Sequence, residues 1–477
     1  MLDQEIPTAI LQQITTQQAW HYTILPYQFS GKRLALYVSE ENLKPSLSEE
    51  LEVLLGYHID LTPVATDSLK EALSKYYRKP KDSRTKSQNI DTSLKDSKNI
   101  LLVLVQEAKN LGSSDIHFEP YEEKARIRMR IDGVLIERYI LKKADYPSLT
   151  NKIKIQANLD IAEKRLPQDG RIFLQDANQK QLDIRVSVMP TLHGEKIVLR
   201  LLSNEAIQVE LSGLGFNDND LAAYTAGIER PNGIILISGP TGSGKTTTLY
   251  ATLKLLNSTT KNIVTIEDPI EYTLEGINQV QLKENIGLDF PSAMRTFLRQ
   301  DPNIIMVGEI RDKATAAMAI RASLTGHIVL STIHTNSAWG IIARLVDMGI
   351  PAYLLADTLN TAVAQRLVRL LCKTCKKAES FDPQLLPKHY KLPSPIIQHY
   401  VPNGCENCFY TGYWGRQAIY EVITIDSELA TEIKQENFNV KTMLENKGVK
   451  DLADNAFQIF KAGLTSLAEI YPILASK

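Results

Sequence analysis

GIILISGPTGSGKTTTLYATLKLL, residues 233–256, decides the fold of the largest part of this chain. An apolar run is followed by a glycine-rich loop and then by a segment of helical character, so the sequence predicts a buried strand, a turn and a helix. Glycines let successive backbone N–H groups turn inward, and a helix N-terminus adds partial positive charge. The spacing therefore predicts a phosphate-binding loop. A strained turn that binds no nucleotide is the alternative.

Several loop residues are expected to surround the phosphates of ATP. Lys245 is expected to reach the β- and γ-phosphates, and the Thr246 hydroxyl is expected to bind Mg²⁺. The predicted nucleotide-binding residues of the loop are Gly239, Pro240, Thr241, Gly242, Ser243, Gly244, Lys245, Thr246 and Thr247.

Acidic residues end two further apolar segments. IVTIEDPIEY (263–272) places Glu267 and Asp268 after a strand, with Glu271 nearby, and NIIMVGEIRD (303–312) places Glu309 after another. Ligands collect beyond the carboxyl ends of parallel strands, so both clusters are expected to converge on the phosphate loop. Helix caps and solvated turns are the ordinary alternative for such acids.

Two histidines bound a third apolar segment, HIVLSTIHTN (327–336). His334 stands at the far end of this predicted strand, where it is placed to sense a γ-phosphate. His327 opens the strand after a glycine and lies farther from that edge, so a structural role and a functional role stay open for it.

Length and rhythm divide the chain into several domains, because 477 residues exceed what one core supports. From Pro231 the order strand, loop, helix repeats, which predicts an α/β fold with a parallel sheet covered on both faces. In KARIRMRIDG, Arg126, Arg128 and Arg130 share one strand face, which is either a subunit interface or a solvated face. The predicted segments are an N-terminal α/β domain (1–77), a flexible linker (78–99), a second α/β domain (100–230), an ATPase domain (231–371), a cysteine lobe (372–412) and a C-terminal helical region (413–477).

All four cysteines lie in two CxxC pairs, Cys372 with Cys375 and Cys405 with Cys408. Four thiolates in this arrangement suit tetrahedral Zn²⁺ without an open position, so we expect a structural zinc site. A redox CxxC is the alternative, but two pairs without a thioredoxin-like context argue against it. The preceding RLVRLLCKTCKK is basic, yet it comes without aromatic stacking residues, so we expect no nucleic-acid binding by this lobe.

Charge and hydropathy limit the location. The 54 Lys and Arg residues nearly balance the 55 Asp and Glu residues, so no global field marks a nucleic-acid or membrane binder. No run reaches the roughly eighteen apolar residues that a bilayer span needs, and MLDQEIPTAI lacks the pattern of a signal peptide. We therefore expect a cytosolic protein.

Together these motifs resemble those of the secretion ATPase superfamily that powers type II secretion, type IV pilus assembly and related DNA-uptake machines. GPTGSGKTTTLY resembles its Walker A motif, VTIEDPIEY its Asp box, LRQDPNIIMVGEIRD its Walker B motif and TGHIVLSTIHTN its His box; LDIAEKRLPQDGRI is similarly distinctive. The resemblance covers about residue 100 to the C-terminus. It implies a RecA-like P-loop ATPase domain preceded by a PAS-like domain, and subunits assembled as a hexamer.

The resemblance also implies roles for single residues. Glu267 would activate the attacking water, Glu309 would act in the Walker B metal shell, and His334 would be the His-box residue. Arg185 in DIRVS and Arg200 in VLRLL match the segments that carry phosphate-sensing arginines, although solvated ion pairs are the ordinary alternative for both.

Within the superfamily, RASLTGH and QRLVRLLC are most similar to the E-type ATPases of type II secretion. This implies a cytoplasmic ATPase, peripheral at the inner membrane, that drives pseudopilus assembly and protein export across the outer membrane. Its N-terminal domain would dock onto the cytoplasmic part of an inner-membrane platform protein. Three alternatives remain open: a type IV pilus assembly ATPase, a nucleic-acid translocase, and a regulatory subunit that binds nucleotide without hydrolysing it.

Overall fold

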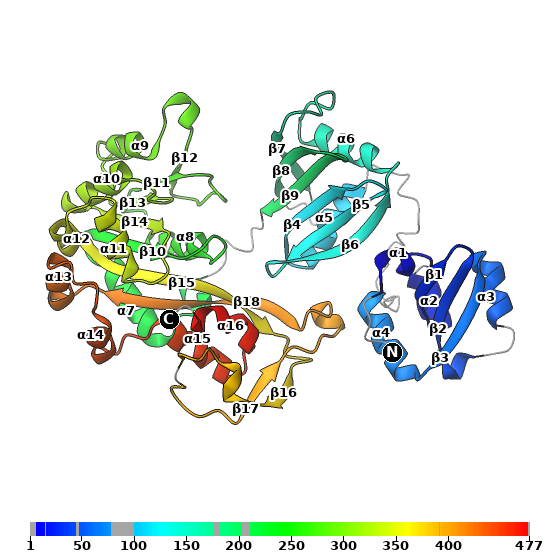
Figure 1. The fold of residues 1–477 in the computed structure, drawn as a ribbon. Coiled ribbons are helices and arrows are strands. Elements are labelled where there is room, and N and C mark those ends of the chain that lie inside the picture. The colour runs from blue at the N-terminus through cyan, green and yellow to red at the C-terminus, as the bar shows by residue number, and fades with distance from the viewer. Residues whose placement is uncertain are drawn as a thin grey trace. The chain divides into compact units, whose positions relative to one another are not determined.

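The computed structural model describes residues 6–14, 16–43, 47–77, 100–175, 181–202, 210–390 and 392–475 (Figure 1). The predicted linker, residues 78–99, lies outside the described residues. The chain forms two compact units, one with residues 1–93, 371–379 and 400–414 and one with residues 94–370, 380–399 and 415–477. No described helix is long and apolar enough to cross a membrane.

The N-terminal residues form a three-stranded sheet in the order β1-β2-β3. β1 pairs antiparallel with β2, and β2 pairs parallel with β3. Leu34, Leu36 and Val38 alternate along β2 and are fully buried, as a period of two predicts for a sheet with one face on a core. The elements are α1 (Thr8–Leu11), α2 (Thr16–Tyr22), β1 (Ile24–Ser30), β2 (Arg33–Ser39), α3 (Leu47–Leu55), β3 (His58–Val64) and α4 (Thr66–Tyr76).

A second sheet has six antiparallel strands in the order β6-β5-β4-β9-β8-β7. In β5, Ile127, Met129 and Ile131 are buried and the arginines between them are partly exposed, which confirms the predicted alternation. The elements are α5 (Ile100–Asn110), β4 (Ser113–Pro120), β5 (Lys124–Ile131), β6 (Val134–Lys142), α6 (Tyr146–Gln156), β7 (Gln168–Gln175), β8 (Gln181–Thr191) and β9 (Gly194–Leu202).

α6 ends at Gln156, before the segment LDIAEK. Asn158 takes a φ of 56°, and the backbone N–H of Leu159 donates to the carbonyl of Lys154 at 2.8 Å. A left-handed residue with this bond closes a helix, so residues 159–164 form a loop.

The largest sheet has seven strands in the order β12-β11-β13-β14-β10-β15-β18, and its last strand, β18, is formed by Tyr413–Thr424. β10 pairs parallel with both β14 and β15, and β11 pairs parallel with both β12 and β13. Every residue of β10, β11, β13 and β14 is buried, as the sequence predicted for a sheet covered on both faces. The elements are α7 (Asp218–Ile228), β10 (Gly233–Ser238), α8 (Lys245–Leu256), β11 (Ile263–Glu267), β12 (Asn278–Gln281), α9 (Phe290–Phe297), β13 (Ile304–Val307), α10 (Lys313–Leu324), β14 (Ile328–Ile333), α11 (Gly340–Asp347), α12 (Ala352–Thr358) and β15 (Leu359–Leu371).

Two apolar clusters cover the two faces of this sheet. Ile235 and Ile237 of β10 pack in one cluster with Leu249 and Leu253 of α8. The alternate residues of β10 belong to the other cluster, which includes residues of α9 and α10. Burial on both sides fixes β10 in the middle of the sheet, and the phosphate loop therefore starts from a rigid base.

The C-terminal region begins with a strand and continues as helices from Ser427. Its first segment, YWGRQAIYEVIT, is rich in aromatic and β-branched residues, which fit a pleated and buried surface, and it forms the last strand of the large sheet. The elements are β16 (Lys377–Ser380), β17 (Gln398–Val401), β18 (Tyr413–Thr424), α13 (Ser427–Lys434), α14 (Lys441–Asn446), α15 (Leu452–Lys461) and α16 (Leu467–Leu474).

Candidate nucleotide site and cysteine cluster

The loop between β10 and α8 depends on glycine. Gly239, Gly242 and Gly244 have φ values of 149°, 81° and 88°, which side chains disfavour. A Cβ atom on Gly239 would lie 2.4 Å from the carbonyl oxygen of Gln365. The loop therefore packs its backbone directly against β15.

Gln365 fixes this loop through both ends of its amide. Its Nε2 donates to the carbonyl of Ser243 at 2.8 Å, and its Oε1 accepts from Thr248 Oγ1 at 3.0 Å. Gln365 is buried, and Thr248 also lies 3.1 Å from the Tyr420 hydroxyl. Sequence reasoning missed Gln365, although a glutamine inside the apolar segment LNTAVAQRLV was a usable signal.

α8 begins at the loop without a side-chain cap. Its N-cap residue is Gly244, and no side chain accepts a hydrogen bond there. The first N–H groups of a helix have no partner within the helix, so they can bind an anion. Thr246 is exposed in this first turn. The N-terminal end of α8 therefore offers backbone N–H donors and the exposed Thr246 hydroxyl beside the loop.

Lys245 folds back onto the loop. Its Nζ donates to the carbonyls of Gly239 at 2.8 Å and Pro240 at 3.0 Å. Burial lowers the pKa of Lys245; the Glu309 charge acts to raise this pKa and the Arg366 charge acts to lower it. The amine thus lies among loop carbonyls, close enough to Glu309 for their charges to interact.

Glu309 follows β13 and stands next to His334. Its Oε2 lies 3.6 Å from His334 Nε2, and its Oε1 accepts a hydrogen bond from Arg311. His334 also lines an open pocket of about 240 Å³ together with Gly239, Pro240, Thr335 and Asn336. Lys245, Glu309 and His334 therefore gather at the phosphate loop, where the sequence placed them.

Glu267, the last residue of β11, belongs to a different hydrogen-bonded cluster. Its carboxylate is buried, and it accepts from Thr265 Oγ1 at 2.6 Å, from Gln279 Nε2 at 3.0 Å and from the Tyr250 hydroxyl. Among the described side chains, the structure does not bring Glu267 into hydrogen-bonding contact with Lys245 or Glu309. The surrounding residues were not predicted, because their approach depends on the fold.

Asp268 and His327 are the other predicted acid and histidine positions. Asp268 directly after β11 is exposed. His327 Nδ1 lies 2.8 Å from the carbonyl of Ala322 and 3.2 Å from Thr325 Oγ1, at the end of α10. This arrangement favours the structural role for His327.

The two predicted phosphate-sensing arginines form ion pairs. Arg200 Nε lies 3.0 Å from Asp115 Oδ1, and the Arg200 side chain is 57% exposed. Arg185 Nη1 lies 3.4 Å from Glu271 Oε2, and Arg185 also donates to the carbonyl of Ile270. Contact of either arginine with a nucleotide stays a prediction.

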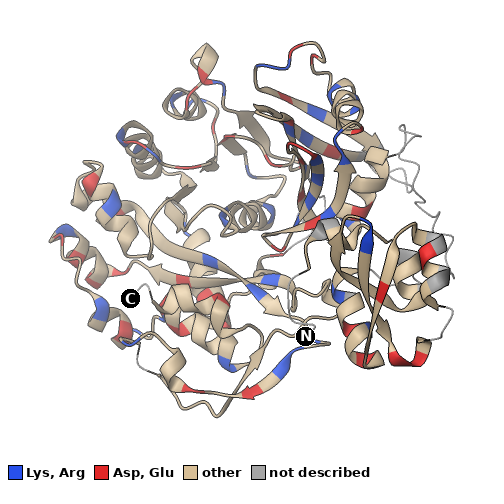
Figure 2. Cartoon of the chain, turned by 45° about the vertical axis from the view of Figure 1, so that its right-hand side comes forward, with Lys and Arg blue, Asp and Glu red and all other residues tan. Residues whose placement is uncertain are grey.

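The arginine stripe of β5 faces carboxylates of β4. Glu119 Oε2 accepts from Arg126 Nε at 2.8 Å, and its Oε1 accepts from Arg128 Nη2 at 2.7 Å. Burial acts to raise the pKa of Glu119, but hydrogen bonds from Arg128, Arg126 and Lys196 lower this pKa to about 2. The stripe is therefore a paired network on one sheet. Figure 2 shows basic and acidic residues interspersed along the ribbon.

The four cysteines converge in space. Their sulfur atoms all lie within 4.8 Å of one another, with Cys372 and Cys405 at 3.8 Å and Cys375 and Cys408 at 3.7 Å. Burial acts to raise the pKa of Cys372, but hydrogen bonds from the Thr374 backbone and from Cys405 lower it to about 7. Four converging sulfur ligands fit a tetrahedral zinc ion.

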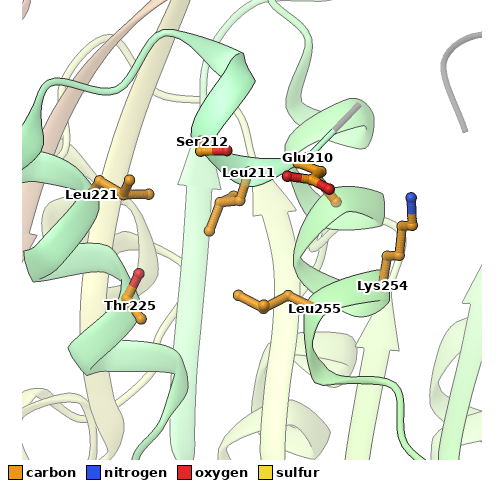
Figure 3. Close-up of a pocket in the computed structure, with 8 residues that line it drawn as sticks. Glu210, Leu211, Ser212, Leu221, Thr225, Lys254 and Leu255 are labelled. Atoms are coloured by element: carbon orange, nitrogen blue, oxygen red, sulfur yellow. The ribbon is translucent and has the colours of Figure 1, made fainter. Parts of the chain in front are cut away.

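A larger pocket lies between α7 and the C-terminal half of α8. Its volume is about 470 Å³, and Figure 3 shows Lys254 and Leu255 of α8 opposite Leu221 and Thr225 of α7. Glu210 forms part of the wall, and the residues immediately before it, 203–209, lie outside the described residues. We assign no ligand to this pocket.

Comparison with known proteins places these motifs in context. A family described as Type II/IV secretion system protein matches residues 93–472. The type IV pilus assembly ATPase PilB of Myxococcus xanthus is 40% identical, covering 95% of this chain and 86% of that protein. The type II secretion system protein E of Dickeya dadantii is 43% identical, covering 78% of this chain and 74% of that protein.

Among solved structures, the pilus retraction motor PilT with bound ADP is similar with a TM-score of 0.53 and 26% identity. The similar region covers 77% of this chain and 95% of that chain. The RecA-like P-loop fold predicted from the motifs is confirmed by this likeness and by the parallel sheet.

Proposed function

This chain belongs to the Type II/IV secretion system protein family, and from that premise we propose that it hydrolyses ATP to ADP and phosphate to power type II secretion. The work would be assembly of the pseudopilus and protein export across the outer membrane. The observation that carries this proposal is the gathering of Lys245, Glu309 and His334 at the phosphate loop.

ATP would bind with its phosphates against the loop and the N-terminus of α8. Backbone N–H groups would donate to phosphate oxygens, and the ammonium of Lys245 would leave the carbonyls of Gly239 and Pro240 for the β- and γ-phosphates. The Thr246 hydroxyl and the Glu309 carboxylate would supply the hard oxygen ligands that Mg²⁺ prefers. Bound Mg²⁺ would neutralise charge on the phosphates.

Glu267 is the proposed base. The attacking water would give a proton to Glu267 as its oxygen bonds to the γ-phosphorus. The bond between that phosphorus and the bridging oxygen breaks, and ADP keeps the electron pair. His334, at 3.6 Å from Glu309, would contact the γ-phosphate side of the nucleotide.

We further propose that the chain works as a hexamer whose domains close on ATP. Arg185 or Arg200 would exchange its carboxylate partner, Glu271 or Asp115, for phosphate oxygens. Charge-assisted bonds of this kind are strong, and a nearly complete switch requires a preference of roughly 5.5 kcal/mol for the closed state. Opening would follow hydrolysis and product release.

The remaining parts receive supporting roles in the same proposal. Zn²⁺ held by the four cysteines would stabilise the lobe of residues 372–412, and residues 1–77 would dock on the cytoplasmic domain of an inner-membrane platform protein. We also retain the predicted linker (78–99), second α/β domain (100–230), ATPase domain (231–371) and C-terminal region (413–477) in this proposal. The protein would then lie in the cytoplasm, peripheral to the inner membrane, without binding nucleic acid.

ATP turnover tests the phosphate site. Lys245→Ala is expected to abolish turnover without unfolding the chain, because the lysine is half-exposed and the loop is also held by Gln365. Glu267→Gln is expected to bind ATP and hydrolyse it poorly. Normal turnover by Lys245→Ala would refute the assignment of the loop.

The wild-type chain tests the alternative functions. Binding of ATP without turnover would indicate a regulatory subunit, and stimulation of turnover by DNA or RNA would indicate a translocase.

Type IV pilus assembly is the second candidate function. The specific observation in its favour is that the match to the PilB of Myxococcus xanthus extends over 95% of this chain. Co-purification with candidate platform proteins of both systems, using the whole chain and a chain that lacks residues 1–77, separates the two. Capture only by a pilus platform protein would favour pilus assembly, and loss of capture on truncation would locate the dock.

A further inference from the structure

Tyr250 lies beside Glu267 with an orientation that its neighbours determine. Its hydroxyl is in hydrogen-bonding contact with Glu267 Oε2, and it also accepts from the backbone N–H of Glu271 at 3.3 Å. Gln279 Nε2 lies 3.4 Å from the same oxygen. A phenol has one proton to donate, and an N–H group can only donate, so this proton goes to the carboxylate of Glu267.

The amide of Gln279 is also oriented by its surroundings. Its Oε1 accepts from the backbone N–H of Leu274 at 2.7 Å, and its Nε2 donates to the carbonyl of Tyr272 at 3.1 Å. Nε2 is thus the atom that faces Glu267 Oε1. Together with the Thr265 hydroxyl, three uncharged donors hold the two carboxylate oxygens.

These donors leave one acceptor position on Glu267. A carboxylate offers about four lone-pair positions, and donors among the described residues fill three of them, two on Oε1. The remaining position belongs to Oε2, the oxygen that Tyr250 holds. A base that takes a proton from water needs a free position of this kind, at a defined distance from the phosphate.

Tyr250 comes from the same helix as the phosphate loop. α8 begins at Lys245, and Tyr250 lies in its second turn, packed edge-on against the ring of Tyr272 at a centroid distance of 4.5 Å. Tyr250 is 1% exposed. One rigid helix therefore carries both the end that binds phosphate and the hydroxyl that holds Glu267.

We propose that Tyr250 is a positioning residue for ATP hydrolysis: its hydroxyl fixes Oε2 of Glu267 relative to the phosphate loop, so that this oxygen receives the proton of the attacking water. Gln279 and Thr265 fix the other oxygen. This role rests on the proposed function of Glu267. None of these three residues was among the sequence-predicted site residues.

The test compares Tyr250→Phe with a matched control. Tyr224 is also buried, and its hydroxyl lies 2.8 Å from Thr252 Oγ1 of α8, so Tyr224→Phe removes a similar hydroxyl that does not touch Glu267. With the whole chain, we expect Tyr250→Phe to lower kcat by roughly 10- to 100-fold while KM and the affinity for a fluorescent ATP analogue change less than about twofold. Tyr224→Phe is expected to leave kcat within about twofold.

A double variant separates positioning from a general structural effect. If Tyr250 acts through Glu267, Tyr250→Phe added to Glu267→Gln lowers single-turnover hydrolysis no further. A decrease by the same factor as in the wild type, or a wild-type kcat in Tyr250→Phe, overturns the positioning role. Should Tyr250→Phe fail to fold, Gln279→Ala at the sheet edge replaces it, with the same expected loss and the same non-additivity.

The same measurements distinguish the two levels of the proposal. Glu267→Gln with wild-type turnover overturns Glu267 as the base. Poor turnover by Glu267→Gln together with normal turnover by Tyr250→Phe retains the base and rejects the positioning role.

Discussion

Single residues of the phosphate loop differ in why they must be glycine. Gly242 has a φ of 81° but no atom within 4 Å of an added Cβ, whereas Gly239 combines a φ of 149° with the backbone of β15 at 2.4 Å. Gly242 is required for its positive φ, whereas Gly239 is required both for its positive φ and for the close approach of β15. The motif alone does not distinguish them, because the contact with Gln365 comes from a distant part of the sequence.

The expected result is a different penalty for the same substitution. Gly242→Ala costs about 1–2 kcal/mol of backbone strain and leaves the loop in place. Gly239→Ala forces the loop away from β15, because backbone atoms cannot turn aside. We expect Gly239→Ala to weaken binding of ATP at least roughly tenfold more than Gly242→Ala, measured by titration with a fluorescent analogue. Equal affinities would show that contact with β15 does not shape the loop.

At the scale of elements, a buried polar contact joins two helices and a strand. Asp220 Oδ2 of α7 accepts from Asn455 Nδ2 of α15 at 3.2 Å, and the same Nδ2 lies 2.8 Å from the Tyr420 carbonyl of β18. Asn217 Nδ2 also donates to Asp220 Oδ2 at 2.6 Å. Burial raises the pKa of Asp220 to about 6.

This raised pKa predicts a pH-dependent stability. The contribution of Asp220 to the free energy of unfolding is fully present below pH 3.8, the pKa of this carboxyl in the unfolded chain. This contribution is lost as the pH rises through about 6, because ionising the buried carboxyl is costly. Asp220→Asn is therefore expected to stabilise the fold above pH 6, by roughly 3 kcal/mol at most, and to have no such effect near pH 4. Urea unfolding of both chains from pH 4.5 to 8 measures the difference.

Asp426 provides a control of opposite sign. Burial acts to raise its pKa, but the backbone N–H of Leu429 and the Lys447 ammonium lower it below the ordinary value. Its contribution is present above pH 3.8 and is lost as the pH falls. Asp426→Asn should therefore destabilise the fold at neutral pH. A difference for Asp220→Asn that does not change with pH would contradict the role of its charge.

Elements differ in how far the sequence predicts them. β10, the loop and α8 follow from one continuous pattern, and the alternation in β5 follows from a period of two. The strand β18 was not anticipated within residues 413–477, because its place beside β15 is set by pairing over a long sequence distance. The roles of Tyr250 and Gln279 were not predicted for the same reason. One residue lies in a helix and the other on an edge strand, and both contact Glu267 only in the folded chain.

At the scale of the whole molecule, the cysteine cluster and the phosphate site lie in different units of the chain. Within the described residues, the hydrogen bonds that hold the loop come from residues such as Thr248 and Gln365, and none comes from a cysteine. The two sites should therefore fail independently.

Removal of one zinc ligand tests this independence. Cys375→Ser is expected to reduce bound zinc, measured by elemental analysis, to near zero and to increase proteolysis within residues 372–414, because three sulfur ligands hold the ion poorly. ATP binding is expected to persist. Asn407→Ala is the matched control, since this residue lies between two cysteines and its side chain donates to Thr374 Oγ1 at 3.3 Å. Full zinc content in Cys375→Ser would exclude the four-sulfur site.

The sharing of α8 by Lys245 and Tyr250 constrains how such chains diverge. An inserted or deleted residue between them would swing the aromatic side chain by about 100° around the helix axis, away from Glu267. Surface loops tolerate insertions and deletions, but the segment of α8 between Lys245 and Tyr250 should not. Among distant homologues, a tyrosine five positions after the loop lysine would thus indicate that the residue equivalent to Glu267 is oriented in the same way. Another residue at this position would indicate that a different side chain orients that carboxylate.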